Sequence, residues 1–405
     1  MSVEKKVPEI RFKEFSGEWV EKILGELVQL ENGFAFQSKY FKKSPTEVIV
    51  LTPGSVNIGG GFQADKGQFY DTKQEVPTRY VFRPNDMFIT MTDLTPTAQA
   101  LGYPAIVPKD NNTYLHNQRL GKLVGYKGDL GFLYNLLRTT KKQKEIVATS
   151  SGTTVKHTSP DKFLNRACFF PENEEQTAIG NTFEKLESLI NQHQQKHDKL
   201  SNIKKSMLEK MFPKQGETVP EIRFKGFSGA WMEKELGSVA QVTMGQSPSG
   251  ENYTNNPNDF ILVQGNADLK NGFVVPRVWT SEVTKMAVKG ALIFSVRAPV
   301  GEVGKNNYDV VLGRGVAAVY GNEFIYQQLQ KLKSDNYWHK VSAGSTFDAI
   351  SSTELALTLM WISSESEQEK IGNYFQKLDA LINQHQEQII KLNNIKQAYL
   401  IKMFV

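Results

Sequence analysis

The chain has 405 residues, of which 40% are hydrophobic and 11% aromatic, a composition typical of globular proteins. This length allows two or three domains with cores of their own. No apolar run approaches the roughly 18–20 residues that cross a membrane, and no apolar stretch of a signal peptide follows the N-terminus, so we expect a cytoplasmic protein. The single cysteine, Cys168, excludes an internal disulfide framework. The net charge of +5 is a weak indication of a polyanionic partner.

A short motif near the N-terminus occurs twice. Val-Pro-Glu-Ile-Arg-Phe-Lys, followed by Phe-Ser-Gly and Trp, spans residues 7–19 and returns over residues 219–231. We call it the opening motif. Its Arg-Phe-Lys run could contact DNA phosphates, but its Phe and Trp side chains favour docking onto the rest of the fold. We favour the docking role and keep phosphate contact as the alternative.

Each opening motif precedes a segment that differs between the two copies, residues 20–171 and 232–363. Short apolar runs bounded by Pro, Gly, Asn or Asp predict strands at residues 80–82, 87–90, 260–263 and 291–294. Helices are predicted over residues 130–147 and 323–340. Each helix leads into a polar loop, at residues 151–154 and 343–346.

Charge distinguishes these two variable segments. Residues 20–171 contain 19 Lys and Arg against 13 Asp and Glu, a net charge of +6, whereas residues 232–363 contain 11 against 12, a net charge of −1. If both segments bind nucleic acid, the first should neutralise more phosphate charge.

A long helix with a heptad pattern closes each copy. Apolar residues at alternating spacings of three and four predict a coiled-coil seam in both helices. The candidate seam and docking positions are Ile179, Phe183, Leu186, Ile190 and Leu200, and Ile371, Phe375, Leu378, Ile382 and Leu392. His193 and His385 occupy matching seam positions. We interpret them as polar residues that set the register, with a metal pair as the alternative.

The two repeats have different offsets, which define the domain organisation. The opening motif repeats after 212 residues and the helix after 192, so the second variable segment is shorter than the first. We predict an α+β protein: two mixed α/β domains separated by two long antiparallel coiled-coil helices, with a pseudo-two-fold internal duplication. The expected boundaries are 1–171 for the first domain, 172–213 for the central helix, 214–363 for the second domain and 364–405 for the C-terminal helix.

Catalytic motifs are largely missing from the sequence. It contains no GxxxxGK[ST] phosphate loop, no GxGxxG after a strand, no GxSxG elbow and no Asn/Asp-Pro-Pro-Tyr/Phe loop of an amino-methyltransferase. Its six His and one Cys show no metal-ligand spacing. A PD…ExK nuclease core is left open by pattern alone, although no carboxylate pair stands out. We expect no catalytic residues, no metal and no cofactor in this chain.

Four features together resemble the specificity subunit of type I restriction–modification systems. They are the duplicated Pro-Glu-Ile-Arg-Phe opening, the long heptad helix in two copies, the Gly-[Ser/Thr]-Thr loops and the Glu-Gln start of each helix. The loops lie at Gly152 and Gly344, and the helix starts at Glu175-Gln176 and Glu367-Gln368. Residues 245–249 and 297–301 are also similar. The resemblance covers almost the whole chain.

This resemblance implies two target-recognition domains, each reading half of an interrupted DNA sequence in the major groove. It implies that the paired helices fix the length of the unread spacer and dock two methyltransferase subunits. Those partners would bind S-adenosylmethionine and methylate adenines, and separate restriction subunits would use ATP and Mg²⁺ to translocate and cut. The chain itself would be a non-catalytic subunit.

Candidate DNA-reading residues follow from residue type and loop position, since Arg pairs with guanine and Asn or Gln with adenine. In the first domain they are Gln37, Ser38, Lys39, Asn117, Gln118 and Arg119. In the second domain they are Gln246, Ser247, Ser249, Gln264, Asn266, Arg297 and Arg314. Two other functions stay open: a coiled-coil assembly scaffold with incidental DNA contact, and a self-contained DNA methylase or nuclease.

Overall fold

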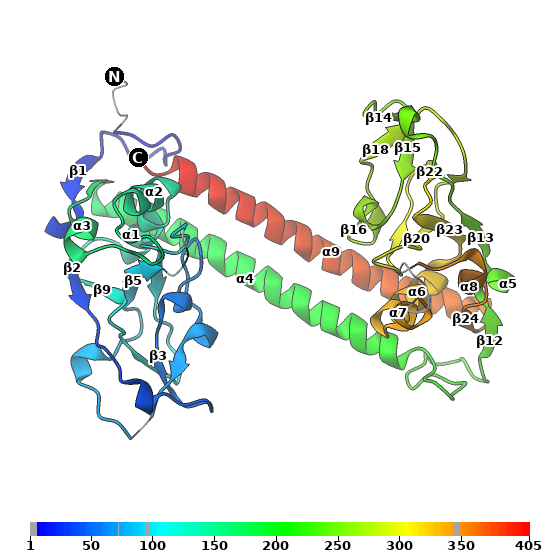
Figure 1. Ribbon diagram of the computed structural model, residues 1–405, viewed down its shortest axis with the longest axis horizontal. Coiled ribbons are helices and arrows are strands. Elements are labelled where there is room, and N and C mark those ends of the chain that lie inside the picture. The colour runs from blue at the N-terminus through cyan, green and yellow to red at the C-terminus, as the bar shows by residue number, and fades with distance from the viewer. Residues whose placement is uncertain (1–5, 72, 94, 96, 343–348) are drawn as a thin grey trace. The chain divides into compact units, whose positions relative to one another are not determined.

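The computed structural model describes residues 6–71, 73–93, 95, 97–342 and 349–405. It divides into two compact units, one formed by Met1–Gln192 with Ile389–Val405 and the other by His193–Gln388. Two long helices, α4 (Asn173–Lys210) and α9 (Glu365–Lys402), contribute residues to both units. The C-terminal end of α9 therefore belongs with the N-terminal strands, as Figure 1 shows.

In its described residues, the first unit is built from short, mostly antiparallel strands, three short α-helices and several 3-10 turns. Its largest sheet has the order β2 (Gln29–Asn32), β9 (Leu120–Val124), β5 (Met87–Thr90), β7 (Pro104–Ile106). The other sheets are β4 (Gln68–Phe69), β3 (Val48–Val50), β8 (Thr113–Leu115), and the pairs β1 (Val20–Ile23) with β11 (Ala167–Phe170) and β6 (Thr92–Asp93) with β10 (Lys156–His157). The helices are α1 (Leu130–Leu137), α2 (Thr140–Ala148) and α3 (Pro160–Leu164).

The second unit repeats this plan with longer sheets. Its six-stranded sheet has the order β13 (Gln241–Met244), β23 (Val316–Tyr320), β20 (Leu292–Ser295), β21 (Val303–Lys305), β17 (Phe273–Val274), β16 (Leu269–Lys270). A five-stranded sheet has the order β14 (Tyr253–Thr254), β18 (Val278–Thr280), β15 (Phe260–Val263), β22 (Val310–Leu312), β19 (Met286–Ala287), and β12 (Met232–Glu235) pairs with β24 (Leu359–Ile362). The short helices are α5 (Leu236–Val239), α6 (Glu323–Ser334), α7 (Tyr337–Ser342) and α8 (Ser352–Ala356).

Most predicted elements are present, but both predicted medium-length helices are broken. The helix expected over residues 130–147 is interrupted at Thr139, whose extended backbone starts a new helix while its side chain accepts a hydrogen bond from the amide of Lys142. The helix expected over 323–340 ends at Ser334, and Asn336 adopts a positive φ of 56° before α7 begins. The strand expected at 80–82 is wrong: Thr78–Tyr80 forms a 3-10 turn, and only a single bridge joins Val81 to Leu115.

The long helices pair antiparallel within each unit, as the sequence predicts. In the first unit Phe183 packs against Phe404, and Glu187 lies 2.8 Å from Lys396, so advancing along α4 retreats along α9. In the second unit His193 contacts His385 and Lys204 contacts Asp379, so the two helices again run in opposite directions. The seam residues buried in the structure are Ile179, Phe183, Ile371, Phe375 and Leu378, whereas Leu186, Ile190, Leu200, Ile382 and Leu392 are half-buried.

Candidate nucleic-acid interface

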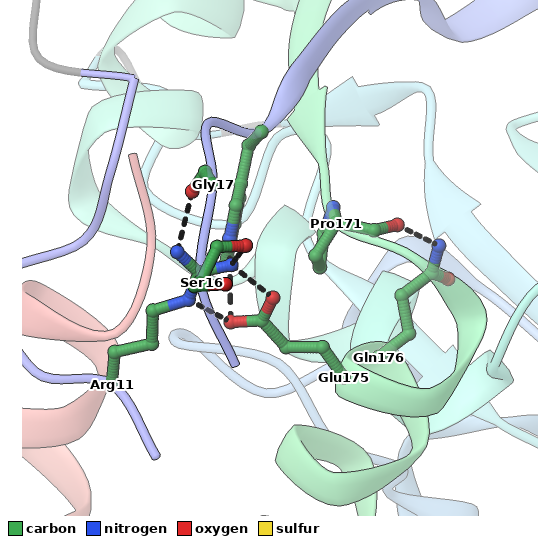
Figure 2. A network of polar contacts seen from close by, with 7 residues as sticks. Arg11, Ser16, Gly17, Pro171, Glu175 and Gln176 are labelled. Carbon is green, nitrogen blue, oxygen red and sulfur yellow. Dashed lines mark hydrogen bonds and ion pairs between the residues drawn. The ribbon is translucent and has the colours of Figure 1, made fainter. Parts of the chain in front are cut away.

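The opening motif is tied to the start of a long helix in each unit. Arg11 donates from Nε and Nη2 to the two carboxylate oxygens of Glu175, at 2.8 and 2.7 Å, and also to the carbonyls of Gly17 and Ser16 (Figure 2). Glu175 is only 3% exposed and also accepts a 3.4 Å bond from Trp19. The hydrogen bond to Glu175 raises the pKa of Arg11 above its ordinary value.

The same arrangement recurs in the second unit. Arg223 donates to both carboxylate oxygens of Glu367, at 2.6 and 2.8 Å, and to the carbonyls of Gly229 and Ser228. The tryptophans are buried in matching aromatic clusters, Trp19 on Phe132 and Phe404, and Trp231 on Phe212 and Phe324. The arginines are therefore engaged inside the fold, which favours the docking role of the opening motif over phosphate contact.

Strand register aligns the two domains residue by residue near the candidate reading loops. In the first domain β2 pairs with β9 so that Gln29 faces Val124, and in the second β13 pairs with β23 so that Gln241 faces Tyr320. Just beyond these strands, Phe34 donates from its amide to the carbonyl of His116 at 2.8 Å. Gln246 donates in the same way to the carbonyl of Leu312, also at 2.8 Å.

In both domains a glycine lets these two backbone segments cross in close contact, and we call this approach the crossing. A Cβ on Gly33 would lie 2.2 Å from the carbonyl oxygen of Asn117, and a Cβ on Gly245 would lie 2.0 Å from that of Gly313. Counting forward from this crossing, Gln118 corresponds to Arg314. Arg119, the arginine of the first loop, corresponds to Gly315 and not to Arg314.

The first-domain candidates lie on two neighbouring exposed turns. Gln37, Ser38, Lys39, Gln118 and Arg119 are exposed, and Asn117 is half-buried. A bridge pairs Asn117 with Phe34, three residues before Gln37, so the two turns leave the same crossing. The side-chain oxygen of Asn117 accepts a 2.9 Å bond from the amide of Arg119 and so shapes the turn itself.

Five of the seven second-domain candidates line one pocket of about 510 Å³, namely Ser247, Gln264, Asn266, Arg297 and Arg314. The other two, Gln246 and Ser249, flank it in sequence. Ser249 is exposed, and its amide donates to Glu282 at 2.7 Å and its hydroxyl to Glu251 at 3.2 Å. The carbonyl of Gln246 accepts a bond from the hydroxyl of Thr284, while its side chain remains exposed.

Other residues, which residue type alone did not single out, lie beside these candidates. Tyr253 and Ser295 also line the second-domain pocket. In the first domain Thr92 pairs with His157 as Arg297 pairs with Ala349, so Thr92 is the counterpart of Arg297. The offset of 192 between His157 and Ala349 is visible in the sequence and could have exposed this pairing. The loop at Gly344 lies outside the described residues.

A buried histidine packs beneath the first candidate reading turn. His116 is 1% exposed, and its Nε2 lies 3.0 Å from the carbonyl oxygen of Leu120. Burial lowers the pKa of His116 to about 4. The ring is therefore neutral at pH 7, with the proton on Nε2 donated across the base of the turn that carries Gln118.

Metal-binding and membrane features are few in the described part of the chain. No cluster of three or more His, Cys, Asp or Glu residues there could hold a metal ion. His193 and His385 meet with their Nδ1 atoms 2.9 Å apart, and burial, with the nearby charges of His193, Lys196 and His197, lowers the pKa of His385. Among the described helices, none combines the length and apolarity needed to cross a membrane.

Known proteins share this organisation. The family model of the type I restriction modification DNA specificity domain matches residues 16–202 and 229–394. A relative from Methanocaldococcus jannaschii, named as the MjaX type I restriction enzyme specificity subunit, is 25% identical over 343 residues, which cover 80% of this chain and 79% of the relative.

Solved structures show the same fold. The S subunit of a type I restriction–modification system from M. genitalium is 17% identical, with a TM-score of 0.65 over 98% of this chain and 99% of that one. A chain from a structure described for the complex assembly and conformational transition of the type I R-M system is 23% identical, with a TM-score of 0.54 over 94% of this chain and 96% of that one. This protein belongs to the type I restriction–modification DNA specificity family and is a DNA sequence-recognition subunit.

Proposed function

We propose that this chain reads a bipartite, interrupted DNA target, with one half-site for each domain. The observation that carries the proposal is the shared backbone crossing, which presents different exposed side chains in the two domains, Gln118 in one and Arg314 in the other. One geometry with two sets of polar groups suits the reading of two different sequences from base edges in the major groove.

We also propose that the duplicated frame carries two methyltransferase subunits and brings restriction subunits to the target. The Arg11–Glu175 and Arg223–Glu367 ion pairs hold the opening motif to a long helix in the same way in both units, so one chain carries two equivalent copies of this arrangement. The solved relative described for complex assembly of the type I R-M system supports such an assembly. S-adenosylmethionine, ATP and Mg²⁺ then belong to the partners, this chain is non-catalytic, and the complex works in the cytoplasm.

The long helices are proposed to set the spacer between the half-sites. Each has 38 residues, which corresponds to a rod of about 57 Å at 1.5 Å per residue. Half-sites read from one face of DNA lie about 34 Å apart, within the span of such a rod. Insertion of one heptad near residues 196–199 should lengthen the preferred spacer, and an unchanged spacer in an active complex would contradict this role.

Exchange of residues 20–171 for the matching segment of a relative tests the recognition function. Sequencing of methylated DNA from cells that carry the complex should show a change confined to one half-site. An unchanged methylated sequence would favour the alternative of an assembly scaffold. Binding of S-adenosylmethionine, or cleavage of DNA, by the purified chain alone would instead indicate a self-contained enzyme.

A further inference from the structure

We propose that Arg314 and Gln118 are equivalent specificity-determining residues, with Arg314 reading a guanine in the second half-site and Gln118 an adenine in the first. This inference rests on the proposed reading of one half-site by each domain. It goes beyond that function by naming one residue in each domain and the base that this residue selects.

The backbone places the two residues in the same position. In both domains an amide just beyond the first strand donates to a carbonyl that lies two residues before the candidate reading residue. The bond runs from Phe34 to His116, two residues before Gln118, and from Gln246 to Leu312, two residues before Arg314. Each turn then folds back onto this segment. The amide of Gln118 donates to the carbonyl of Phe34 at 3.1 Å, and the amide of Arg314 donates to the hydroxyl of Ser247 at 3.0 Å.

Arg314 is presented by two glycines that lie against a neighbouring backbone. A Cβ on Gly313 would lie 3.1 Å from Cα of Gln264, and a Cβ on Gly315 would lie 2.1 Å from the carbonyl oxygen of Gln264. Only the middle residue of this turn can therefore carry a large side chain outward. Packing of the two glycines against Gln264 sets the backbone position of Arg314.

The chemistry of the Arg314 side chain fits guanine. It is exposed at the edge of the 510 Å³ pocket, and no hydrogen bond or ion pair to its guanidinium is found among the residues that the structure describes. A guanidinium presents parallel N–H donors, and guanine presents O6 and N7 as parallel acceptors in the major groove. Ser247 and Asn266, which line the same pocket, add neutral polar groups beside it.

Gln118 has the chemistry for adenine. It is exposed, and its side chain makes no hydrogen bond within the described ranges, whereas the oxygen of neighbouring Asn117 is engaged by the amide of Arg119. A carboxamide carries one acceptor and one donor group, which match N6 and N7 of adenine. The two domains thus differ, one residue beyond the shared crossing, by a change from amide to guanidinium.

Reciprocal substitution in the intact complex tests the assignment. Arg314→Gln, Gln118→Arg and the control Arg314→Lys would each be expressed with the methyltransferase subunits, and binding would be measured on duplexes that are randomised at each half-site. Arg314→Gln should change one preferred guanine of the second half-site to adenine, with a preference change of about 10- to 100-fold, and leave the first half-site unchanged. Gln118→Arg should make the opposite change in the first half-site. Arg314→Lys should weaken the guanine preference, because the forked donor pair is lost.

The outcomes separate this inference from the proposed function. If the wild-type complex shows a bipartite preference and the variants select the same bases as the wild type, the base assignment is wrong while the recognition function stands. If Arg314→Gln weakens binding equally to all sequences and reduces the salt dependence, Arg314 contacts phosphate and the assignment is also wrong. If the wild-type complex has no bipartite preference, the proposed function itself fails.

Discussion

The Arg11–Glu175 ion pair between the opening motif and the long helix allows a quantitative prediction. Arg11→Met removes both strong donors to Glu175, whose side chain is 3% exposed. Among the described residues, the carboxylate then keeps only the 3.4 Å bond from Trp19. Removing one partner of a buried ion pair costs about 3–5 kcal/mol. Because the Arg11 side chain is 14% exposed, water can reach the vacated position, so we expect about 3 kcal/mol, near the lower end of that range.

The second unit supplies a matched variant. Arg223→Met removes the donors to Glu367, which is 1% exposed. No bond from Trp231 remains in this case, because its indole N–H has no hydrogen-bond partner in the described part of the chain. This variant should lose about 1 kcal/mol more than Arg11→Met, the typical contribution of one hydrogen bond.

Hydrogen exchange of the full chain in increasing urea, read by mass spectrometry, measures both effects locally. Arg11→Met should lower the opening free energy of the β1–β11 pair and leave that of β12–β24 unchanged, and Arg223→Met should do the reverse. The double variant Arg11→Met/Glu175→Leu removes the unpaired charge and should recover most of the loss. A loss below about 1 kcal/mol for Arg11→Met, or a double variant no more stable than the single one, would refute the reasoning.

Three other predictions follow from the same geometry. Burial lowers the pKa of His116 from 6.5 to about 4, so the unfolded chain binds more protons than the folded chain below pH 6.5. The free energy of unfolding of the first unit should therefore fall by up to about 3 kcal/mol between pH 6.5 and 4. The urea midpoint measures this loss, and a midpoint that does not change with pH would contradict it. Gly245→Ala should cost about 1–3 kcal/mol and weaken recognition of the second half-site, whereas Gly250→Ala, where a Cβ meets nothing within 4 Å, should change neither in thermal unfolding and binding assays. Replacing His193 and His385 together by Leu should raise the unfolding temperature. The increase should be largest below pH 6.5, because the depressed pKa of His385 makes its protonation in the folded chain unfavourable. An equal or lower unfolding temperature would contradict the register interpretation.

The duplicated frame could be predicted from the sequence because its physical signals are local and repeated. Heptad spacing identifies α4 and α9, and the recurrence of Trp19 as Trp231 indicates a structural role that the aromatic clusters bear out. The break at Thr139 could not be predicted in this way, since one extended residue inside a helical pattern leaves the apolar periodicity almost unchanged.

The arrangement of the candidate reading residues was only partly predictable, for a different reason. Gln264, Arg297 and Arg314, which were selected by residue type and loop position, line one pocket. Residue type could not show that Arg119 corresponds to Gly315, because strand register and the crossing at Gly33 determine that alignment. It also could not show that the amide of Ser249 donates to Glu282, since that contact joins segments 33 residues apart.

The Gly313–Arg314–Gly315 turn has an evolutionary consequence. Its conformation depends on glycines and on main-chain contacts with Gln264, and the exposed side chain between them contributes nothing that the fold requires. Arginine and glutamine codons can differ by a single nucleotide. If Arg314 reads a base as proposed, a single mutational step would change the preferred sequence of the second half-site and leave the fold intact.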